Sequence, residues 1–336
     1  MRGRFSPRKL LLPLVPAYRM GLWLRAQGPG ANSAPVKRLR LPVVSIGNLS
    51  TGGSGKTPLT IALAKALTAR GVHVDVLSRG YPRKTVTAAR VPPQGAAAEF
   101  GDEPLLITGK AGIAVYVAHD RYQAGLLAEG DLVAITVLGE PQKPGIHLLD
   151  DGFQHRQLHR DADIVLLDRG DWADSLLPAG NLREPREAAF RADVLAIPAE
   201  DRELAEELAA WGWNRPVWRV RRRMEIPEVD GPVAAFCGIA RPEQFFDGLF
   251  AGGLDLVVRR SFRDHHPYTP GDVKQLAQLA RRAGARTLIT TEKDQVRLGR
   301  LAAGFGDSLG LRTVGLTVEL EEDAAGWLMS RLGLST

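Results

Sequence analysis

The sequence predicts an α/β fold in which a mostly parallel sheet is flanked by helices and a second, smaller α/β lobe follows. Three observations predict it. A glycine-rich loop separates a strand-like run from a helical pattern, several short apolar runs follow, and an arginine-rich stretch at 218–232 changes the composition. The apolar runs are continuous rather than alternating, which is typical of strands buried on both faces of a sheet.

The first elements follow the order strand, loop, helix, strand. PVVSIGN (42–48) is a β-branched run that leads into the loop, and residues 57–71 carry apolar side chains at helical spacing and end at Gly71. Pro58 is compatible with this helix because a first-turn proline loses no helical hydrogen bond. HVDVLSRG (73–80) is the second strand, which completes the repeating unit of a parallel α/β sheet.

Five later apolar runs are expected to be further strands of the same kind. They are residues 113–119, 131–138, 146–151, 162–168 and 192–198. The arginine-rich stretch then marks a boundary, after which strand-like runs and helical patterns begin again. The predicted organisation is therefore a basic apolar arm at 1–40, a core at 41–228 and a C-terminal α/β lobe at 229–336.

Charge is distributed unevenly along the 336 residues. Residues 1–40 contain nine Lys or Arg and no Asp or Glu, so the rest of the chain carries a net charge of −3 although the whole carries +6. A nucleic-acid-binding protein would be expected to carry its basic stripe on the folded body, so no nucleic-acid partner is predicted. The single cysteine, Cys237, excludes an internal disulfide.

The basic arm is apolar between its charges, with LLLPLVPAY at 10–18 and MGLWL at 20–24. Its longest uncharged run is well short of the ~20 residues that span a bilayer. Leucine, tryptophan and tyrosine interleaved with arginine are typical of a helix that lies in the membrane interface. The alternative is an amphipathic helix packed on the protein's own body.

The loop GNLSTGGSGKTP (47–58) matches the second half of the phosphate-binding pattern G-x-x-x-x-G-K-[ST] but has serine where the first glycine belongs. Its glycines allow backbone N–H groups to converge on phosphate oxygens at the start of a helix. Lysine would reach the β- and γ-phosphates and threonine would ligate Mg²⁺, so a P-loop NTPase-type core is predicted. The nucleotide-binding residues expected are Ser50, Thr51, Gly52, Gly53, Ser54, Gly55, Lys56 and Thr57.

A phosphate loop requires an acidic residue at the end of a neighbouring strand to order the metal. HLLDD supplies Asp150 and Asp151, whose side chains should point to opposite faces of the sheet, so one faces the phosphates and the other a second partner. The polar turn GFQH (152–155) follows directly. The alternative is that Asp168 ends the metal strand.

Two other clusters contain more ionisable groups than turns require. GDEP places Asp102 and Glu103 before an apolar helix, where they are either a catalytic pair or a helix cap. FRDHHPY places Asp264, His265 and His266 together in the second lobe. Zinc would need further ligands, whereas a histidine that assists a carboxylate base suits phosphoryl transfer.

Taken in order, these motifs closely resemble the tetraacyldisaccharide 4′-kinase family, the lipid A 4′-kinases of Gram-negative outer-membrane biosynthesis. The resemblance extends from about residue 10 to about residue 300, and DDGFQH, LREP and TEKD are particular to that family. The loop without its first glycine is also the family's habit. The chain departs from the family's pattern at Asn181, where proline is commoner, and at Gln295, where alanine is.

The resemblance implies a kinase that uses ATP and Mg²⁺ to phosphorylate the 4′-hydroxyl of a lipid-linked glucosamine disaccharide 1-phosphate. It places the protein at the cytoplasmic face of the inner membrane, held by the basic arm, with no obligate protein partner. Carried over by position, Asp102 resembles the catalytic base, His265 its partner and Lys56 the phosphate-binding lysine. Thr57, Asp150, Asp151 and Glu184 are the expected magnesium network, and Arg79, Glu103, His155 and Arg183 the expected substrate contacts.

Two other classes of function share parts of this pattern. A P-loop ATPase or GTPase that acts as a switch would need a residue that positions water and would show no dependence on an acceptor. A nucleic-acid-dependent ATPase would bind nucleic acid with a steep salt dependence, which the charge distribution disfavours.

Overall fold

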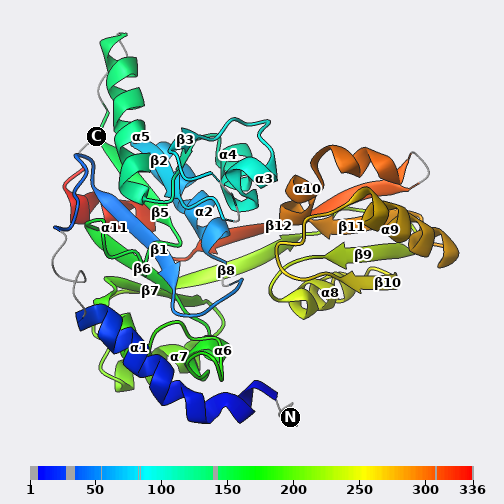
Figure 1. Cartoon of the computed structure of the whole chain (residues 1–336), viewed down its shortest axis with the longest axis horizontal. Coiled ribbons are helices and arrows are strands. Elements are labelled where there is room, and N and C mark those ends of the chain that lie inside the picture. Colours follow the sequence, from blue (N-terminus) through cyan, green and yellow to red (C-terminus); the bar gives the residue numbers. More distant parts are fainter. Residues whose placement is uncertain are drawn as a thin grey trace.

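The computed structural model describes residues 7–27, 35–53, 55–81, 83, 85–138, 143–306 and 309–334. It has two lobes, and two long strands, β8 (Val217–Glu225) and β12 (Gly310–Leu320), run between them (Figure 1). The mostly parallel α/β architecture with helices on the sheet and a second, smaller lobe confirms the predicted fold class.

The described strands form one twelve-stranded sheet in the order β10-β9-β11-β12-β8-β7-β6-β1-β5-β2-β4-β3. Neighbours are parallel except at β3/β4 and β8/β12. The remaining strands are β1 (Val43–Asn48), β2 (His73–Ser78), β3 (Ala89–Arg90), β4 (Ala114–Val117), β5 (Gly145–Asp150), β6 (Ala162–Leu166), β7 (Val194–Pro198), β9 (Val233–Cys237), β10 (Leu256–Ser261) and β11 (Thr287–Thr291).

Strand β1 lies between β5 and β6 in the larger lobe, and all six of its residues are buried. Its apolar composition fits a central parallel strand, which has no solvent-facing side. The register pairs Ile46 with Asp150 and Asn48 with Leu166. Parallel strands end at the same edge of a sheet, so the loops that follow β1, β5 and β6 meet there.

Helices cover this sheet and make the core. The helix after the phosphate loop, α2 (Lys56–Thr68), contacts α4 (Asp102–Ala111), and its buried leucines belong to the same apolar cluster as Ile46 and Leu148. The other helices of this lobe are α3 (Ala97–Phe100), α5 (Arg121–Val137), α6 (Arg169–Trp172), η2 (Arg186–Arg191) and α7 (Arg202–Ala210).

One expected strand is wrong, because residues 131–138 belong to the end of helix α5. Asp120 caps the helix by accepting a hydrogen bond from the backbone N–H of Tyr122, and the helix continues to Val137. A short apolar run fits a strand and a helix equally well, and here the helical start signal decides. Val137 is 80% exposed and Leu138 86% exposed, so the run lies at a projecting tip rather than in the sheet.

The second lobe has its own apolar clusters beneath β9, β10 and β11. Its helices are α8 (Pro242–Ala251), α9 (Pro270–Arg282), α10 (Glu292–Leu298) and η3 (Gly299–Phe305). Within the range 229–336, the first half of β12 pairs with β11 and the second half with β8. The last helix, α11 (Ala324–Leu332), packs on α2 of the larger lobe.

The N-terminal arm forms η1 (Pro7–Leu14) and α1 (Val15–Gln27), which lie along the lower edge of the larger lobe in Figure 1. Val15 and Tyr18 pack against the apolar cluster beneath them, and the Tyr18 hydroxyl donates to the carbonyl oxygen of Arg183. Most other large apolar residues of the arm are exposed. Among the described helices, none is long and apolar enough to cross a membrane.

Candidate active site

The phosphate loop follows β1 and is held from below by side-chain hydrogen bonds. Gly52 and Gly55 have φ angles of 102° and 89°, which only glycine adopts without strain. Ser50, which replaces the usual first glycine, is fully buried and donates from its hydroxyl to Asp171 at 2.9 Å. The serine therefore anchors the start of the loop. Ser54 lies outside the described residues.

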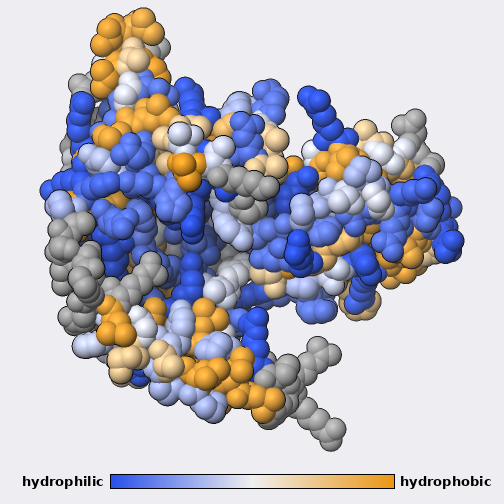
Figure 2. All heavy atoms as spheres, viewed as in Figure 1, coloured by the Kyte–Doolittle hydropathy of each residue, from blue (hydrophilic) through white to orange (hydrophobic). Residues whose placement is uncertain are grey.

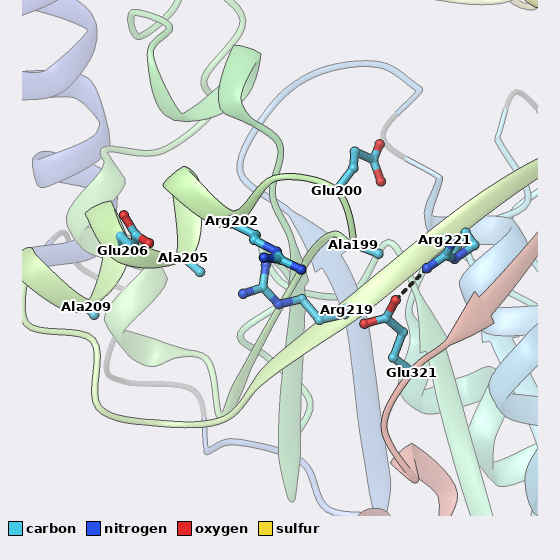
Figure 3. A pocket seen from close by; sticks show the side chains of 9 residues that line it. All are labelled: Ala199, Glu200, Arg202, Ala205, Glu206, Ala209, Arg219, Arg221 and Glu321. Atoms are coloured by element: carbon cyan, nitrogen blue, oxygen red, sulfur yellow. Dashed lines mark hydrogen bonds and ion pairs between the residues drawn. The ribbon is translucent and has the colours of Figure 1, made fainter.

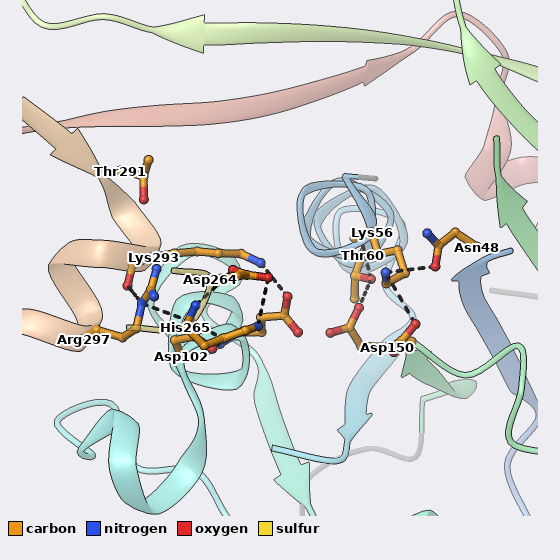
Figure 4. Close-up of polar contacts among 12 residues, drawn as sticks. Asn48, Lys56, Thr60, Asp102, Asp150, Asp264, His265, Thr291, Lys293 and Arg297 are labelled. Carbon is orange, nitrogen blue, oxygen red and sulfur yellow. Dashed lines mark hydrogen bonds and ion pairs between the residues drawn. The ribbon is translucent and has the colours of Figure 1, made fainter. Parts of the chain in front are cut away.

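Lys56 begins α2 and points back across the loop. Its amine donates to Asn48 Oδ1 at 3.0 Å and lies 3.5 Å from Asp151 Oδ1 (Figure 4). Asn48 also donates to the Ser50 hydroxyl at 2.9 Å, so one buried amide joins the lysine to the anchoring serine. These contacts direct the lysine amine across the loop.

Asp150 and Asp151 serve different neighbours. Asp150 ends β5, is buried, and accepts a hydrogen bond from the Thr60 hydroxyl at 3.2 Å. Burial, with the nearby carboxylates of Glu103 and Asp151, raises the pKa of Asp150 to about 7. Asp151 pairs with Arg183 at 2.9 Å and with Lys56, and these cations hold the pKa of Asp151 below its usual value against the effect of burial.

Asp102 and His265 meet across the two lobes. Asp102 begins α4 in the larger lobe and is fully buried, and its Oδ2 lies 3.0 Å from His265 Nδ1 of the second lobe (Figure 4). Arg297 Nε lies 3.3 Å from the same oxygen. Burial opposes ionisation, but the hydrogen bond from His265, together with Lys293 and Arg297, keeps the pKa of Asp102 below its usual value. The carboxylate is therefore held charged.

The two adjacent histidines contact different carboxylates. The hydrogen bond to Asp102 raises the pKa of His265, and this residue has a φ of 55°. His266 Nε2 instead lies 3.2 Å from Asp272, and its ring stacks on Phe262. Of the two histidines, His265 is the one beside the candidate base.

Glu103 follows Asp102 on α4 and forms a second ion pair between the lobes. Lys293 Nζ lies 2.5 Å from Glu103 Oε1, and although burial opposes its charge, Glu103 and Asp102 raise the pKa of Lys293. Lys293 and Arg297 both come from α10, which packs on α4. One helix of the second lobe thus neutralises both carboxylates of GDEP.

Arg79, Arg121 and His155 lie close together near Asp150 and Asp151. Burial and the neighbouring Arg79 lower the pKa of Arg121, and burial together with Arg121 lowers the pKa of His155 to about 4. Among the described residues, Arg121 Nε and His155 Nε2 are buried without a hydrogen-bond partner. Like charges and unsatisfied donors that lie together are suited to an anion.

Arg183 and Glu184 point in different directions from the LREP turn. Arg183 reaches Asn48 Oδ1 at 2.6 Å and Asp151, whereas Glu184 pairs with Arg156 at 3.1 Å and Arg191 at 2.8 Å.

Within the described part of the chain, no group of three or more His, Cys, Asp or Glu side chains is arranged to hold a metal ion. The residues that fit Mg²⁺ are the carboxylate of Asp150, whose raised pKa reflects buried negative charge, and the hydroxyl of Thr57 on the adjacent first turn of α2.

The expected site residues form two groups of contacts. Lys56, Asp151 and Arg183 are joined at the phosphate loop, and Asp102, Glu103 and His265 are held between the lobes, whereas Glu184 is tied to arginines. Sequence reasoning did not assign roles to four residues that the structure brings beside these groups. They are Asn48, Arg121, Lys293 and Arg297. Three lie inside or beside motifs of the sequence, since Asn48 is the second residue of the loop, Lys293 belongs to TEKD and Arg297 lies three residues after it. Arg121 had no such signal.

An open cavity lies elsewhere, between α7 and β8. It has a volume of about 590 Å³, and Arg202, Arg219, Arg221, Glu200 and Glu321 are among its lining residues (Figure 3). Both acidic and basic side chains line the cavity, and Arg221 forms an ion pair with Glu321 at 2.8 Å. Its size does not make it the reaction site, because the lysine, carboxylates and histidine described above lie outside it.

Comparison with known proteins identifies the family of this chain. Residues 7–333 match the family described as LpxK: Tetraacyldisaccharide-1-P 4'-kinase. The chain is 42% identical over 301 residues to "Tetraacyldisaccharide 4'-kinase" of Koribacter versatilis (strain Ellin345), covering 85% of this chain and 89% of the relative. It is 39% identical over 323 residues to the protein of that name from Geobacter metallireducens, covering 88% and 90%.

A solved structure is similar throughout its length. The "apo" form of LpxK from Aquifex aeolicus, described as in complex with ATP, superposes with a TM-score of 0.73 at 32% sequence identity. The match covers 97% of this chain and 99% of that one. The similarity therefore includes both lobes.

Proposed function

We propose that this chain, which belongs to the tetraacyldisaccharide-1-P 4'-kinase family, transfers the γ-phosphate of ATP to the 4′-hydroxyl of a lipid-linked glucosamine disaccharide 1-phosphate. The observation that carries the proposal is the ionised Asp102, paired with His265, together with a helix that begins at Lys56 after the glycines of the loop. A switch ATPase needs a residue that orients water, whereas a buried charged carboxylate suits removal of a proton from an acceptor hydroxyl.

In the proposed reaction, Asp102 accepts the proton of the acceptor's 4′-hydroxyl. The oxygen of that hydroxyl attacks the γ-phosphorus at the same time. The bond between the γ-phosphorus and the β–γ bridging oxygen breaks, and ADP leaves with that electron pair. Lys56, already directed across the loop by Asn48, neutralises charge on the phosphates. His265 donates to Asp102 and keeps its carboxylate in place between proton transfers.

Thr57 and Asp150 are the residues proposed to hold Mg²⁺. When bound there, the ion would supply positive charge that offsets the negative charge of the phosphates. The carboxylate of Asp150 is suited to a cation because it is buried beside two other carboxylates. Asp151 and Glu184 are proposed to act indirectly, since both are paired with arginine.

The acceptor is proposed to be anionic. Arg79 and Arg121 form a positive pair near Asp151, and the neutral ring of His155 lies beside Arg121. The buried Arg121 Nε and His155 Nε2 have no hydrogen-bond partner among the described residues. A phosphate of the acceptor would satisfy them with charge-assisted hydrogen bonds. Arg183, which is bound to Asp151 and Asn48, is proposed to support this side of the site.

A lipid acceptor requires contact with a membrane, and the arm is proposed to make it. Figure 2 shows hydrophobic side chains along the lower edge of the molecule, over η1 and α1. Exposed large apolar residues of the arm are Leu10, Leu11, Leu12, Leu14, Met20, Trp23 and Leu24. With the basic residues between them, they suit the anionic cytoplasmic face of the inner membrane.

The decisive experiment is incubation of the protein with γ-labelled ATP and a disaccharide 1-phosphate lipid, followed by separation of the lipid. Label in the lipid is the expected result, and Lys56→Ala should abolish it. ATP hydrolysis at full rate without lipid would refute the kinase and favour a switch ATPase.

The membrane contact is tested on liposomes that contain anionic lipid. Leu10→Ser with Leu14→Ser and Trp23→Ser should release the protein from the liposomes and leave ATP binding unchanged. This variant spares Val15 and Tyr18, which pack on the lobe. The matched control is Val137→Ser, at the exposed tip of α5, and retained binding by the triple variant would refute the arm's role.

A further inference from the structure

Outside the β8/β12 strands, the two lobes meet on both sides of the phosphate loop. On one side α10 packs on α4, and the turn that carries His265 brings this residue to Asp102 at the start of α4. On the other side Arg241, the residue before α8 in the second lobe, reaches two carboxylates of the larger lobe. Its Nη1 lies 2.5 Å from Asp168 Oδ2 and its Nη2 lies 2.8 Å from Asp171 Oδ1.

The two carboxylates that bind Arg241 are fixed. Asp168 caps α6 by accepting a hydrogen bond from the backbone N–H of Asp171 at 2.7 Å. Asp171 is only 3% exposed. An arginine that binds two carboxylates held in this way has a defined geometry, unlike an isolated surface ion pair, so the position of the second lobe is specified here.

A continuous path of hydrogen bonds leads from this contact to the phosphate-binding lysine. The second oxygen of Asp171 accepts from the Ser50 hydroxyl at 2.9 Å, and Ser50 accepts from Asn48 at 2.9 Å. Asn48 in turn accepts from Lys56 at 3.0 Å. Arg241 of the second lobe is therefore linked to Lys56 through side chains that are part of the loop or directly beneath it.

The turn that carries Arg241 also touches the loop itself. A Cβ atom on Gly52 would lie 3.1 Å from the Cβ of Ala240, so the two backbones approach closely only because residue 52 is glycine. A Cβ atom on Gly53 would lie 3.9 Å from the same Cβ of Ala240. The second lobe thus rests on the glycines of the phosphate loop at the same point where Arg241 is bound.

The reaction needs this seating of the lobes because its dyad is divided between them. Asp102 belongs to the larger lobe and His265 to the second. Asp102 is fully buried in this arrangement, and its carboxylate contacts His265 and Arg297 of the second lobe. The position of the second lobe therefore decides whether the dyad is assembled.

We propose that Arg241 is a positioning residue that seats the second lobe on the phosphate loop through Asp168 and Asp171, and so brings His265 to Asp102. This inference rests on the proposed roles of Asp102 and His265. It predicts that Arg241 acts on the reaction through lobe position and not through contact with either substrate.

The test compares Arg241→Ala, Arg241→Lys and the control Arg221→Ala, which removes an exposed arginine paired with Glu321 on the β8/β12 strands. Arg241→Ala should lower kcat by about 10²-fold, because small misplacements of catalytic groups cost about that much. Its KM for ATP should rise by less than about ten-fold. Arg241→Lys should recover part of kcat, and Arg221→Ala should match the wild type.

Lobe position is measured independently with spin labels on Glu203→Cys in α7 and Lys274→Cys in α9. Both native residues are exposed, and the native Cys237 is buried and will not take a label. Arg241→Ala should broaden the inter-lobe distance distribution, and Arg241→Lys should broaden it less. The distance distribution does not depend on the chemical reaction. The proposed role of Arg241 can therefore be refuted while the kinase proposal stands.

The outcomes are decisive in each direction. A kcat for Arg241→Ala within about two-fold of the wild type, or higher, overturns the proposal. A low kcat with an unchanged distance distribution also overturns it, because Arg241 would then act locally. If Arg241→Ala does not fold, Asp168→Asn replaces it, since the amide can still cap α6 while losing the charge that Arg241 binds.

Discussion

Replacement of Asp102 by asparagine gives the sharpest test of the proposed chemistry. The side chain keeps its size, so the contact between α4 and α10 should persist, but the negative charge that accepts the proton is lost. Asp102→Ala is a poorer choice because it leaves His265 and Arg297 without their buried carboxylate, which costs about 3–5 kcal/mol of stability. With Asp102→Asn, the effect on the chemical step can be measured with less interference from a loss of folding stability.

The expected magnitude follows from the burial of the group. A general base contributes about 10² to 10⁴ in rate, and Asp102 is fully buried, so solvent water cannot take its place. We therefore expect kcat to fall by about 10³ to 10⁴, which is about 4–5 kcal/mol of activation free energy. The KM for ATP should change by less than about three-fold, because Asp102 contacts His265 and Arg297, whereas Lys56 of the phosphate loop contacts Asn48 and Asp151.

The assay is the steady-state transfer of label from ATP to the disaccharide 1-phosphate lipid. The matched control is Asp264→Asn, an exposed carboxylate 3.9 Å from the other nitrogen of His265, which should change kcat by less than about three-fold. A kcat for Asp102→Asn within about ten-fold of the wild type would remove Asp102 from the base role. Equal effects of the two substitutions would instead show a general dependence on negative charge near His265.

Two further predictions concern stability. Gly47→Ala should lower the free energy of unfolding by about 1–3 kcal/mol, because its Cβ would lie 2.5 Å from the Cβ of Phe153 and 2.9 Å from its backbone nitrogen. Gly130→Ala in α5, where nothing lies within 4 Å, should raise it, and thermal melting of the two variants checks both. The second prediction is a pH dependence of the Asp102–His265 pair, in which the folded protein raises the pKa of His265. A raised histidine pKa stabilises the fold fully below the unfolded value and loses that effect as the pH rises through the folded value. The deficit in melting temperature of His265→Asn should therefore be larger at about pH 6 than at about pH 9, and an equal deficit at both would contradict the charge pairing.

The architecture was predictable because local and long-range signals agree. The run 42–48 is apolar on both faces and becomes the central strand β1, and the glycines after it allow the loop to pass into α2. Residues 131–138 show the opposite case. Their composition fits a strand, but the cap at Asp120 begins a helix that absorbs them, and nothing in the run itself reveals this.

The sequence motifs predicted which chemical groups belong to the site, but they did not predict which residues contact those groups. Motifs predicted Asp102, His265 and Lys56, but the residues that hold them come from distant segments. Arg297 lies beside Asp102, from 195 positions later, only because α10 packs on α4. Adjacent carboxylates also gave no hint that Asp150 is buried with a raised pKa while Asp151 is paired with Arg183.

The return of the chain along β12 affects the order in which the protein can be completed on the ribosome. The larger lobe takes its last strand pairing, β12 with β8, and its last helix, α11, from residues that are synthesised after the whole second lobe. Leu328 of α11 shares an apolar cluster with Leu63 of α2, so that cluster lacks part of its core until then. The nascent larger lobe therefore exposes apolar surface while the second lobe is being made, and its dependence on chaperones should be concentrated in that interval.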